Sequence, residues 1–482
     1  MSTNQSHQAL NDTVIANGYC VGCGACAVPE DSPFTIGMDE YGQYQSRMNA
    51  SNVFAKTESD YEKLCPFGAT APNEDEIAKQ HFAETCDHNT QVGYYKGVYA
   101  GHVTEGEFRN RGSSGGMGTW VLNELLDQGL VDYIIHVKSD VDGGDLNNIP
   151  FEYHVSKTLE ETQQGGKSRY YPIELSEVLK TVRNQPGRYA VVGLPCFIKS
   201  IRLLQAQDPI IAERVKYCVG LVCGHLKSAR YAESLAWQMG IAPPDLKAID
   251  FRIKDPSQPA NRYSTYAKGT SGEKVVPTNQ LFGADWGAGA FKYKACDFCD
   301  DVFAETADVV LGDAWLPEYV HDSDGTNVVV TRSDDLQRLI INARSEGRLK
   351  LDDLSVEKAA QSQDAGLRHR KVAIGYRLYR EKSKGNWVPT KRTSPDENLR
   401  PRHERRKQVY RTELRALSHE SFASALKARQ LDVYLEEMAP LYSEYQKYRI
   451  SQGEKLKVYF KQKVRKLLPA KIVELLKCWM RR

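Results

Sequence analysis

Three cysteines near the N-terminus follow one another at intervals of three residues. They are Cys20, Cys23 and Cys26, in the stretch GYCVGCGACAV. A 4Fe–4S cluster takes four thiolates, and this spacing lets one curled segment present three of them. Cys65 precedes a proline in LCPFG, as in the Cys-Pro signature of ferredoxins, and is the predicted fourth ligand. A structural zinc site also uses four thiolates, but usually as two C-x-x-C pairs, so the triplet favours the cluster.

A second set of cysteines is more dispersed along the chain. Cys296 and Cys299 form a C-x-x-C pair in KACDFCDD, whereas Cys196 and Cys223 each end a predicted strand. Because ligands gather beyond the carboxyl ends of strands in such folds, Cys196 and Cys223 are predicted to converge on one sheet edge, and with the C-x-x-C pair they could close a second cluster. Spacing alone leaves a zinc site or a redox dithiol open for the C-x-x-C pair.

The three remaining cysteines lack such spacing. Cys218 lies within an apolar strand and is expected to be a small buried side chain, with a role as a ligand as the alternative. Cys86 and Cys478 are expected to be structural or incidental. The first twenty residues contain neither a basic start nor an apolar stretch, so no secretory signal is predicted. The expected compartment is the cytoplasm, where disulfides are rare.

A glycine-rich loop, RGSSGGMGTWVL, runs into a predicted amphipathic helix that ends at Gly129. Such a loop offers unpaired backbone N–H groups and the positive end of a helix dipole, which suit a pyrophosphate. The candidate binding residues are Ser113, Ser114, Gly115, Gly116 and Thr119. A plain capped helix start without a ligand is the alternative interpretation.

The chain of 482 residues is too long for one compact core, and three regions are predicted. Residues 1–95 form a cysteine-bearing module that ends in a charged linker over 73–95, with one helix in the linker as an option. Residues 96–365 form the main domain, and residues 366–482 a helical, basic extension. Apolar strands are predicted over 96–103, 188–196, 217–224 and 307–315. Because these strands alternate with helices, a mixed α/β fold is expected.

The net charge of +2 hides an uneven distribution. Residues 368–482 carry 30 Lys and Arg against 12 Asp and Glu, a balance of +18, which leaves residues 1–367 at −16. The patterns over 454–468 and after Pro469 predict basic amphipathic helices, which can lie on an anionic membrane surface such as the inner membrane face. Packing of these helices on the chain's own acidic body or on a partner protein is favoured over membrane contact. Nucleic acid is not expected as a partner, because no recognition module accompanies the charge.

Six segments in a fixed order carry a family resemblance. They are CVGCGAC, RGSSGGMGTWVL, VVGLPCFIKSIRLL, GLVCGHLKS, CDFCDDVFAETADVVLGDAW and NVVVTRS. Over roughly residues 18–335, the chain resembles the coenzyme F-420 hydrogenase/dehydrogenase beta-subunit family, which also contains 7-hydroxymethyl chlorophyll a reductase. The resemblance implies a ferredoxin-like N-terminal module, FAD bound at the glycine-rich loop, and an inner 4Fe–4S cluster held by Cys196, Cys223, Cys296 and Cys299.

The resemblance also draws attention to the segments GGKSRYYP and GDAW. Lys167, Ser168 and Arg169 are candidate contacts to phosphate or to the flavin ring, and Arg169 stands where the family segment has lysine. An exposed basic turn is the alternative for this segment. Asp313 of GDAW is expected to line the cluster or flavin pocket.

Together these features predict an FAD-dependent iron–sulfur oxidoreductase. Electrons are expected to pass between a ferredoxin-type donor, the two clusters, FAD and an organic substrate or a reduced deazaflavin coenzyme, since clusters carry single electrons and flavins transfer hydride. The alternative is a non-catalytic electron-transfer subunit that serves a partner enzyme, for example in polysaccharide biosynthesis. No spacing singles out a proton donor among the candidates His102, His136, Tyr170, Tyr171 and Asp313.

Overall fold

The computed structural model describes residues 5–49, 58–139 and 151–449. Its centre is an eight-stranded sheet with the strand order β15-β5-β14-β13-β9-β8-β6-β7. In that order, the strands span Leu349–Asp353, Gly97–Val103, Asn327–Thr331, Val309–Asp313, Val215–Leu221, Tyr189–Gly193, Tyr133–Lys138 and Glu152–Ser156. The strands β13, β9, β8 and β6 run parallel, and they are flanked by strands in antiparallel pairing, β14, β5 and β15 on one side and β7 on the other. The predicted mixed α/β fold is confirmed.

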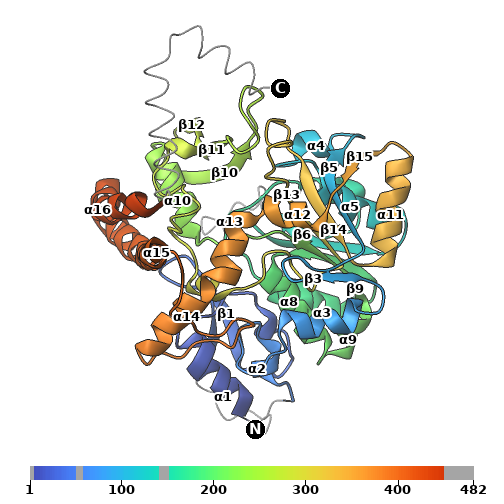
Figure 1. Cartoon of the computed structure of the whole chain (residues 1–482), viewed down its shortest axis with the longest axis horizontal. Coiled ribbons are helices and arrows are strands. Elements are labelled where there is room, and N and C mark those ends of the chain that lie inside the picture. The colour runs from blue at the N-terminus through green and yellow to red at the C-terminus, as the bar shows by residue number, and fades with distance from the viewer. Residues whose placement is uncertain (1–4, 50–57, 140–150, 450–482) are drawn as a thin grey trace.

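Helices cover both faces of this sheet (Figure 1). The helices α5 (Met117–Asp127) and α11 (Asp334–Ser345) pack on one face, and α7 (Ser176–Asn184) and α8 (Pro195–Gln205) pack on the other. Successive residues of a strand point to opposite faces, so Ile134 joins the first layer and Ile135 the second. The predicted end of α5 is confirmed, because Gly129 adopts a φ of +62° just beyond it.

The N-terminal module packs against α8. It consists of α1 (Ser6–Leu10), η2 (Asn11–Ile15), η3 (Ala25–Ala27), the hairpin of β1 (Phe34–Met38) and β2 (Tyr44–Met48), and α2 (Tyr61–Leu64). Apolar residues of the module, such as Val21 and Phe67, share one core with Phe197 and Ile201 of α8. The module therefore lies on the side of the sheet where β8 and β9 end.

The stretch 73–95, predicted as a charged linker with one helix as an option, does contain a helix and is folded onto the body. It contains the helix α3 (Glu74–Phe82) and a short hairpin of β3 (Asp87–Asn89) and β4 (Gly93–Tyr95). The carboxylate of Glu74 is buried and lies 3.1 Å from the Lys199 Nζ atom of α8. A charge-rich sequence gives no sign of such burial, because the partner lies more than a hundred residues away.

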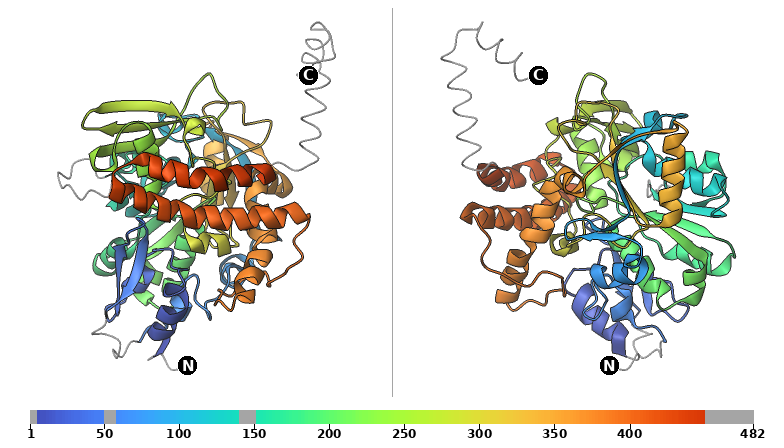
Figure 2. Two further views of the ribbon diagram at one scale, coloured as in Figure 1. Left: turned by 90° about the vertical axis from the view of Figure 1, so that its left-hand side faces the viewer. Right: turned by 45° about the vertical axis from the view of Figure 1, so that its right-hand side comes forward.

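A smaller antiparallel sheet lies beside the main one. Its strands are β10 (Leu246–Ile253), β11 (Ser264–Gly269) and β12 (Gly272–Pro277), and α10 (Ala229–Gln238) packs against it. Two long antiparallel helices, α15 (Arg402–Ala428) and α16 (Leu431–Arg449), cover this region (Figure 2). The rings of Phe422 and Tyr434 lie 5.4 Å from that of Phe291, which attaches the helix pair to the body.

The basic extension reaches the acidic body through buried ion pairs. The stretch that leads into it and opens it contains α12 (Val356–Ser362), α13 (Asp364–Leu367), η8 (Arg368–Val372) and α14 (Ile374–Ser383), and the predicted boundary at residue 366 lies within α13. Arg392 lies 2.6 Å from Glu305, and Arg415 lies 2.9 Å from Asp297. The extension therefore packs on the chain's own body over its described residues, up to residue 449. The helices predicted over 454–468 and after Pro469 lie outside the described residues.

Within the described ranges, every helix is too short or too polar to cross a bilayer.

Candidate functional site

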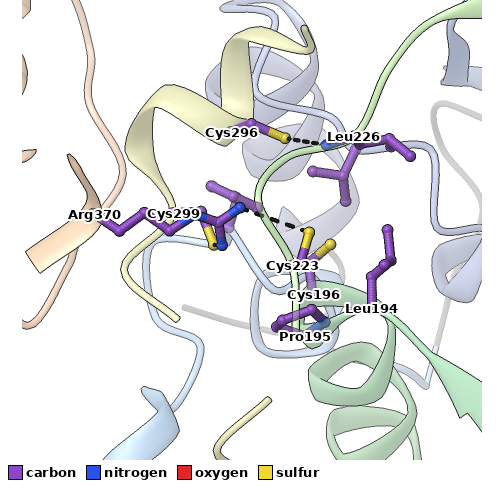
Figure 3. A pocket seen from close by; sticks show the side chains of 10 residues that line it. Leu194, Pro195, Cys196, Cys223, Leu226, Cys296, Cys299 and Arg370 are labelled. Carbon is purple, nitrogen blue, oxygen red and sulfur yellow. Dashed lines mark hydrogen bonds between the residues drawn. The ribbon is translucent and has the colours of Figure 1, made fainter. Parts of the chain in front are cut away.

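Four cysteines from three segments line one buried pocket (Figure 3). Cys196 lies in the first turn of α8, Cys223 follows β9, Cys296 lies in the short helix η7 (Lys294–Phe298), and Cys299 follows it. Cys223, Cys296 and Cys299 are buried, and only Cys196 of the four is partly exposed. Because β8 and β9 are parallel neighbours, their ends bring two of the thiols together. The predicted convergence of these four residues is confirmed.

Cys196 differs in one respect from the sequence expectation. The strand β8 ends at Gly193, and Pro195 begins the helix α8 directly afterwards. Proline suits the first turn of a helix because its missing N–H group would have no partner there. The thiol therefore belongs to a helix start rather than to the end of the strand predicted over 188–196.

The other described cysteines lie elsewhere. Cys218 is fully buried within β9, and its backbone N–H donates to Asp308 at 2.6 Å. It does not line the cysteine pocket, so the alternative that it replaces one of the four is wrong for this geometry. The Cys86 Sγ atom donates to the carbonyl of Arg332 at 3.2 Å, as expected for a structural role. Cys478 lies outside the described residues.

Hydrogen-bond donors reach three of the four pocket sulfurs. The Leu226 N–H donates to the Cys296 Sγ atom at 3.3 Å, and Arg370 donates to Cys299 at 3.1 Å and to Cys223 at 3.7 Å. Burial raises the pKa of Cys296 to about 12. Burial also raises the pKa of Cys223 and Cys299, and the guanidinium of Arg370 opposes that rise.

The chemistry of this donor set fits an iron–sulfur cluster. Four thiols without a competing histidine match the ligation of a cubane by four cysteines, and N–H groups aimed at sulfur are a recurrent means of tuning it. Among the described residues, no three His, Cys, Asp or Glu side chains are set closely enough to hold a single metal ion.

The N-terminal cysteines also gather in one place. Burial raises the pKa of Cys26, and the thiols of Cys23, Cys20 and Cys65 add to that rise as near neighbours. Backbone N–H groups of Gly22 and Ser46 point at the Cys20 Sγ atom from 3.3 and 3.4 Å. The structure therefore brings the triplet and the Cys-Pro cysteine together, with the same kind of N–H donors at sulfur.

The two cysteine sets adjoin each other. Val21 and Phe67, which belong to the N-terminal module, form part of the wall of the inner pocket. Burial raises the pKa of Tyr153, and two thiols add to that rise: Cys196 of the inner set and Cys23 of the N-terminal set. The two groups of cysteines therefore lie close to each other, with side chains of the N-terminal module in the wall of the inner pocket.

The glycine-rich loop and the segment GGKSRYYP also meet. The Ser168 N–H donates to the Ser113 Oγ atom at 2.9 Å. Thr119 and Gly166 line a second small pocket between the two segments. Gly116 adopts a φ of +86° at the start of α5, a conformation that favours glycine. Asn327 accepts a hydrogen bond from the Met117 N–H at 3.1 Å, so one donor of the helix start has a partner within the protein.

The remaining loop candidates are tightly packed. A Cβ atom on Gly115 would lie 2.8 Å from the Gly101 carbonyl oxygen, so only glycine fits there. Ser114 is buried, and its hydroxyl donates to the carbonyl of Thr326 at 3.3 Å. Lys254, which sequence reasoning missed, donates to the Ser114 carbonyl at 3.1 Å and to that of Arg109 at 2.6 Å. Burial lowers the pKa of Lys254 to about 8.

Three charged candidates have partners of their own. Lys167 lies 3.2 Å from the carboxylate of Asp250. Arg169 lies over the Phe151 ring at 4.8 Å, and its Nε atom is buried without a hydrogen-bond partner. Asp313 accepts two hydrogen bonds from Arg252, at 2.8 and 3.2 Å. Arg252 was also missed, because nothing in the spacing of β10 connects it with GDAW.

The candidate proton donors do not form a cluster. His136 is buried, its Nε2 atom lies 2.9 Å from the Ser156 hydroxyl, and burial lowers its pKa to about 3. Burial also lowers the pKa of His102 and raises that of Tyr170 and Tyr171. Asp313 is held by Arg252, so none of the five stands out as a catalytic acid.

Two family models match adjoining parts of the chain. Residues 98–180 match the N-terminal model, and residues 187–357 the C-terminal model, of the coenzyme F420 hydrogenase/dehydrogenase beta subunit. A curated relative, the coenzyme F420 hydrogenase subunit beta of Methanothermobacter thermautotrophicus, is 22% identical over 264 residues. That match covers 53% of this chain and 84% of the relative.

One solved structure is also similar. It is a chain of the F420-reducing [NiFe] hydrogenase complex from Methanosarcina barkeri, studied by xenon derivatisation. The TM-score is 0.46 and the identity 16%, and the match covers 61% of this chain and 96% of that one.

Proposed function

The chain belongs to the coenzyme F420 hydrogenase/dehydrogenase beta-subunit family, and on that premise we propose that it is an iron–sulfur flavoprotein oxidoreductase. The proposed cofactors are two 4Fe–4S clusters and FAD. The proposed organisation is a ferredoxin-like module over residues 1–95, a catalytic domain over 96–365 and a helical extension over 366–482.

Each cofactor has proposed ligands in this chain. One cluster would be held by Cys20, Cys23, Cys26 and Cys65, and the other by Cys196, Cys223, Cys296 and Cys299. FAD would be held by Ser113, Ser114, Gly115, Gly116, Thr119, Lys167, Ser168, Arg169 and Asp313. When bound, the clusters would supply single-electron transfer and the flavin hydride transfer.

One observation carries the proposal. Four thiols that are dispersed over about a hundred residues of sequence line a single buried pocket, and the N-terminal cysteine module forms part of its wall. A buried set of unpaired thiols has no evident structural purpose, whereas adjoining clusters need such an arrangement.

The residues around the pocket suit this role. Leu194, Leu226 and Phe67 line the space and keep water from it, and the N–H groups described above point at the sulfurs. In the N-terminal set, Cys20 and Cys65 are partly exposed. We place the docking of a ferredoxin-type electron carrier there, because electrons enter most readily where a centre approaches the surface.

Iron, acid-labile sulfide and flavin content test the proposal directly. Protein purified without oxygen should contain about eight irons and one flavin per chain, since each cubane holds four irons. Cys23→Ser should leave the flavin in place and reduce the iron to about half. Cys86→Ser is the matched control, because that thiol lies outside both sets, and it should retain all the iron. Zinc without sulfide in the wild-type protein would refute the cluster assignment.

A second candidate function follows from the curated relative, which is named as a subunit of a hydrogenase. In that case the chain would transfer electrons to a partner enzyme, such as one of polysaccharide biosynthesis, and would bind no organic substrate. Dithionite-reduced protein that is reoxidised by a partner, but not by an oxidised deazaflavin or other small acceptor, would favour this function. Rapid reoxidation by a small acceptor alone would favour the enzyme.

The cytoplasm is the proposed compartment. All ten cysteines in the described residues are free thiols, as a reducing environment would keep them. Peripheral contact of residues 450–482 with the inner membrane face is a further proposal, which a flotation assay with anionic vesicles would test.

A further inference from the structure

Arg370 brings a buried positive charge to the inner cysteine pocket. It lies in η8, thirteen residues beyond the end of the family-model match at residue 357, and its exposed fraction is 1%. Its Nη1 atom donates to the Cys299 Sγ atom at 3.1 Å, and its Nη2 atom lies 3.7 Å from the Cys223 Sγ atom (Figure 3). One guanidinium thus spans two of the three segments that supply the thiols.

The other contacts of Arg370 leave its charge available to the sulfurs. Nη2 donates to the Gly224 carbonyl at 2.6 Å, and Nη1 donates to the Asp301 carbonyl. These carbonyls orient the guanidinium but carry no net charge. The neighbouring cations Arg392 and Arg415 differ, since each is paired with a buried carboxylate. In the described part of the chain, no carboxylate forms an ion pair with Arg370.

We propose that Arg370 is a positioning residue of the inner centre, one that stabilises its reduced form through hydrogen bonds to the sulfurs of Cys223 and Cys299. The inference rests on the proposed function, namely that the four thiols hold a redox centre. It assigns part of that centre's tuning to the C-terminal extension, outside the segments that the family models match.

The physical argument concerns charge. One electron added to a thiolate-bound centre makes that centre more negative by one unit. A guanidinium is always protonated, so the compensating charge is already in place and no proton has to accompany the electron. Because the site is buried, the interaction is weakly screened, and removal of the charge should make reduction harder. Lysine would keep the charge but lose the two-pronged geometry that reaches both sulfurs.

Two substitutions of Arg370 and a matched control test the inference. Arg370→Gln removes the charge, and Arg370→Lys keeps it. The control is Arg368→Gln, which removes an exposed positive charge of the same short helix, one that is paired with Asp364. The measurement is a potentiometric titration followed by electron paramagnetic resonance, together with iron and sulfide analysis. The N-terminal centre serves as an internal reference, and Cys23→Ser identifies its signal.

The expected result is a lower reduction potential of the inner centre alone. In Arg370→Gln the reduction equilibrium should shift at least tenfold towards the oxidised form, which is about 59 mV for one electron. Arg370→Lys should shift it less, and Arg368→Gln should leave it unchanged. If the glutamine variant holds no inner iron, the lysine variant decides: a lowered potential supports the inference, whereas a wild-type potential, or loss of the inner iron there too, overturns it.

Two failures are distinguishable. An inner centre that binds iron normally in Arg370→Gln, with the potential of the wild type, would overturn the inference and leave the proposed function standing. Wild-type protein without iron or sulfide would overturn the proposed function itself.

Discussion

Asp297 is the buried carboxylate around which the cations of the extension gather, and its replacement by asparagine should destabilise the protein strongly. Its side chain has an exposed fraction of 0% and forms an ion pair with Lys292. The Arg415 Nε atom lies 2.9 Å from its carboxylate, and Arg377 donates to its backbone carbonyl at 2.6 Å. Asparagine keeps the shape of the side chain but leaves these cations without a counter-charge.

The magnitude follows from the burial. Burial alone would raise the pKa of Asp297, but Lys292, Arg415 and Arg377 lower it, so the carboxylate is ionised in the folded protein. Removal of one partner from a buried ion pair typically costs about 3–5 kcal/mol, because the remaining charge is uncompensated. Asparagine can still accept one hydrogen bond, so we expect about 3 kcal/mol. Asp364→Asn removes an exposed pair with Arg368 and should cost below about 1 kcal/mol.

Urea unfolding of both variants, followed by circular dichroism and tryptophan fluorescence, measures the difference. The double variant Asp297→Asn/Arg415→Met should recover part of the lost stability, since it also removes one of the stranded cations. If Asp297→Asn unfolds at the same urea concentration as Asp364→Asn, the extension does not depend on this carboxylate and the reasoning is wrong.

Three further changes should have local effects. Gly22→Ala places a Cβ atom 2.4 Å from the Tyr44 carbonyl oxygen, so iron analysis should show loss of about four irons; Gly18→Ala, which has a similar φ without that contact, should retain them. His136→Gln should make the protein less sensitive to acid. The pKa of His136 is lowered to about 3, so this residue contributes stability above about pH 6.5 that is lost as the pH falls, and the loss is about 2 kcal/mol at pH 5. Urea unfolding midpoints of both proteins at pH 7 and pH 5 would measure this difference. Lys254→Met releases the glycine-rich loop and should weaken flavin binding about tenfold in a fluorescence titration, with iron content unchanged.

The sequence was most informative where a ligand set is encoded by local spacing or by strand ends. Cys20, Cys23 and Cys26 are neighbours in sequence and cannot be far apart in space. Cys196 and Cys223 could be placed together because apolar strands end just before them and parallel strands end at one edge. For Cys65 and the C-x-x-C pair, the family resemblance and the Cys-Pro signature supplied what spacing could not.

The residues that surround the cysteines were not predictable in the same way. Arg370, Arg252 and Lys254 contact the candidate sites through tertiary packing, and each is an ordinary basic residue in its own segment. The charge difference between the two halves of the chain was visible in the sequence, but its pairing was not. A basic segment looks the same whether it faces a membrane, a partner or a buried carboxylate.

That pairing explains why an acidic body and a basic extension occur in one chain. The inner cysteine segment KACDFCDD, followed by Glu305, places several carboxylates beside four thiols, and as thiolates and carboxylates these groups would repel one another in a buried space. The described extension, residues 368–449, carries 20 Lys and Arg against 10 Asp and Glu, and its buried members lie among these acids. The extension is therefore a structural part of the inner site, and the excess charge left for a membrane or a partner is concentrated in residues 450–482, with ten basic and two acidic side chains.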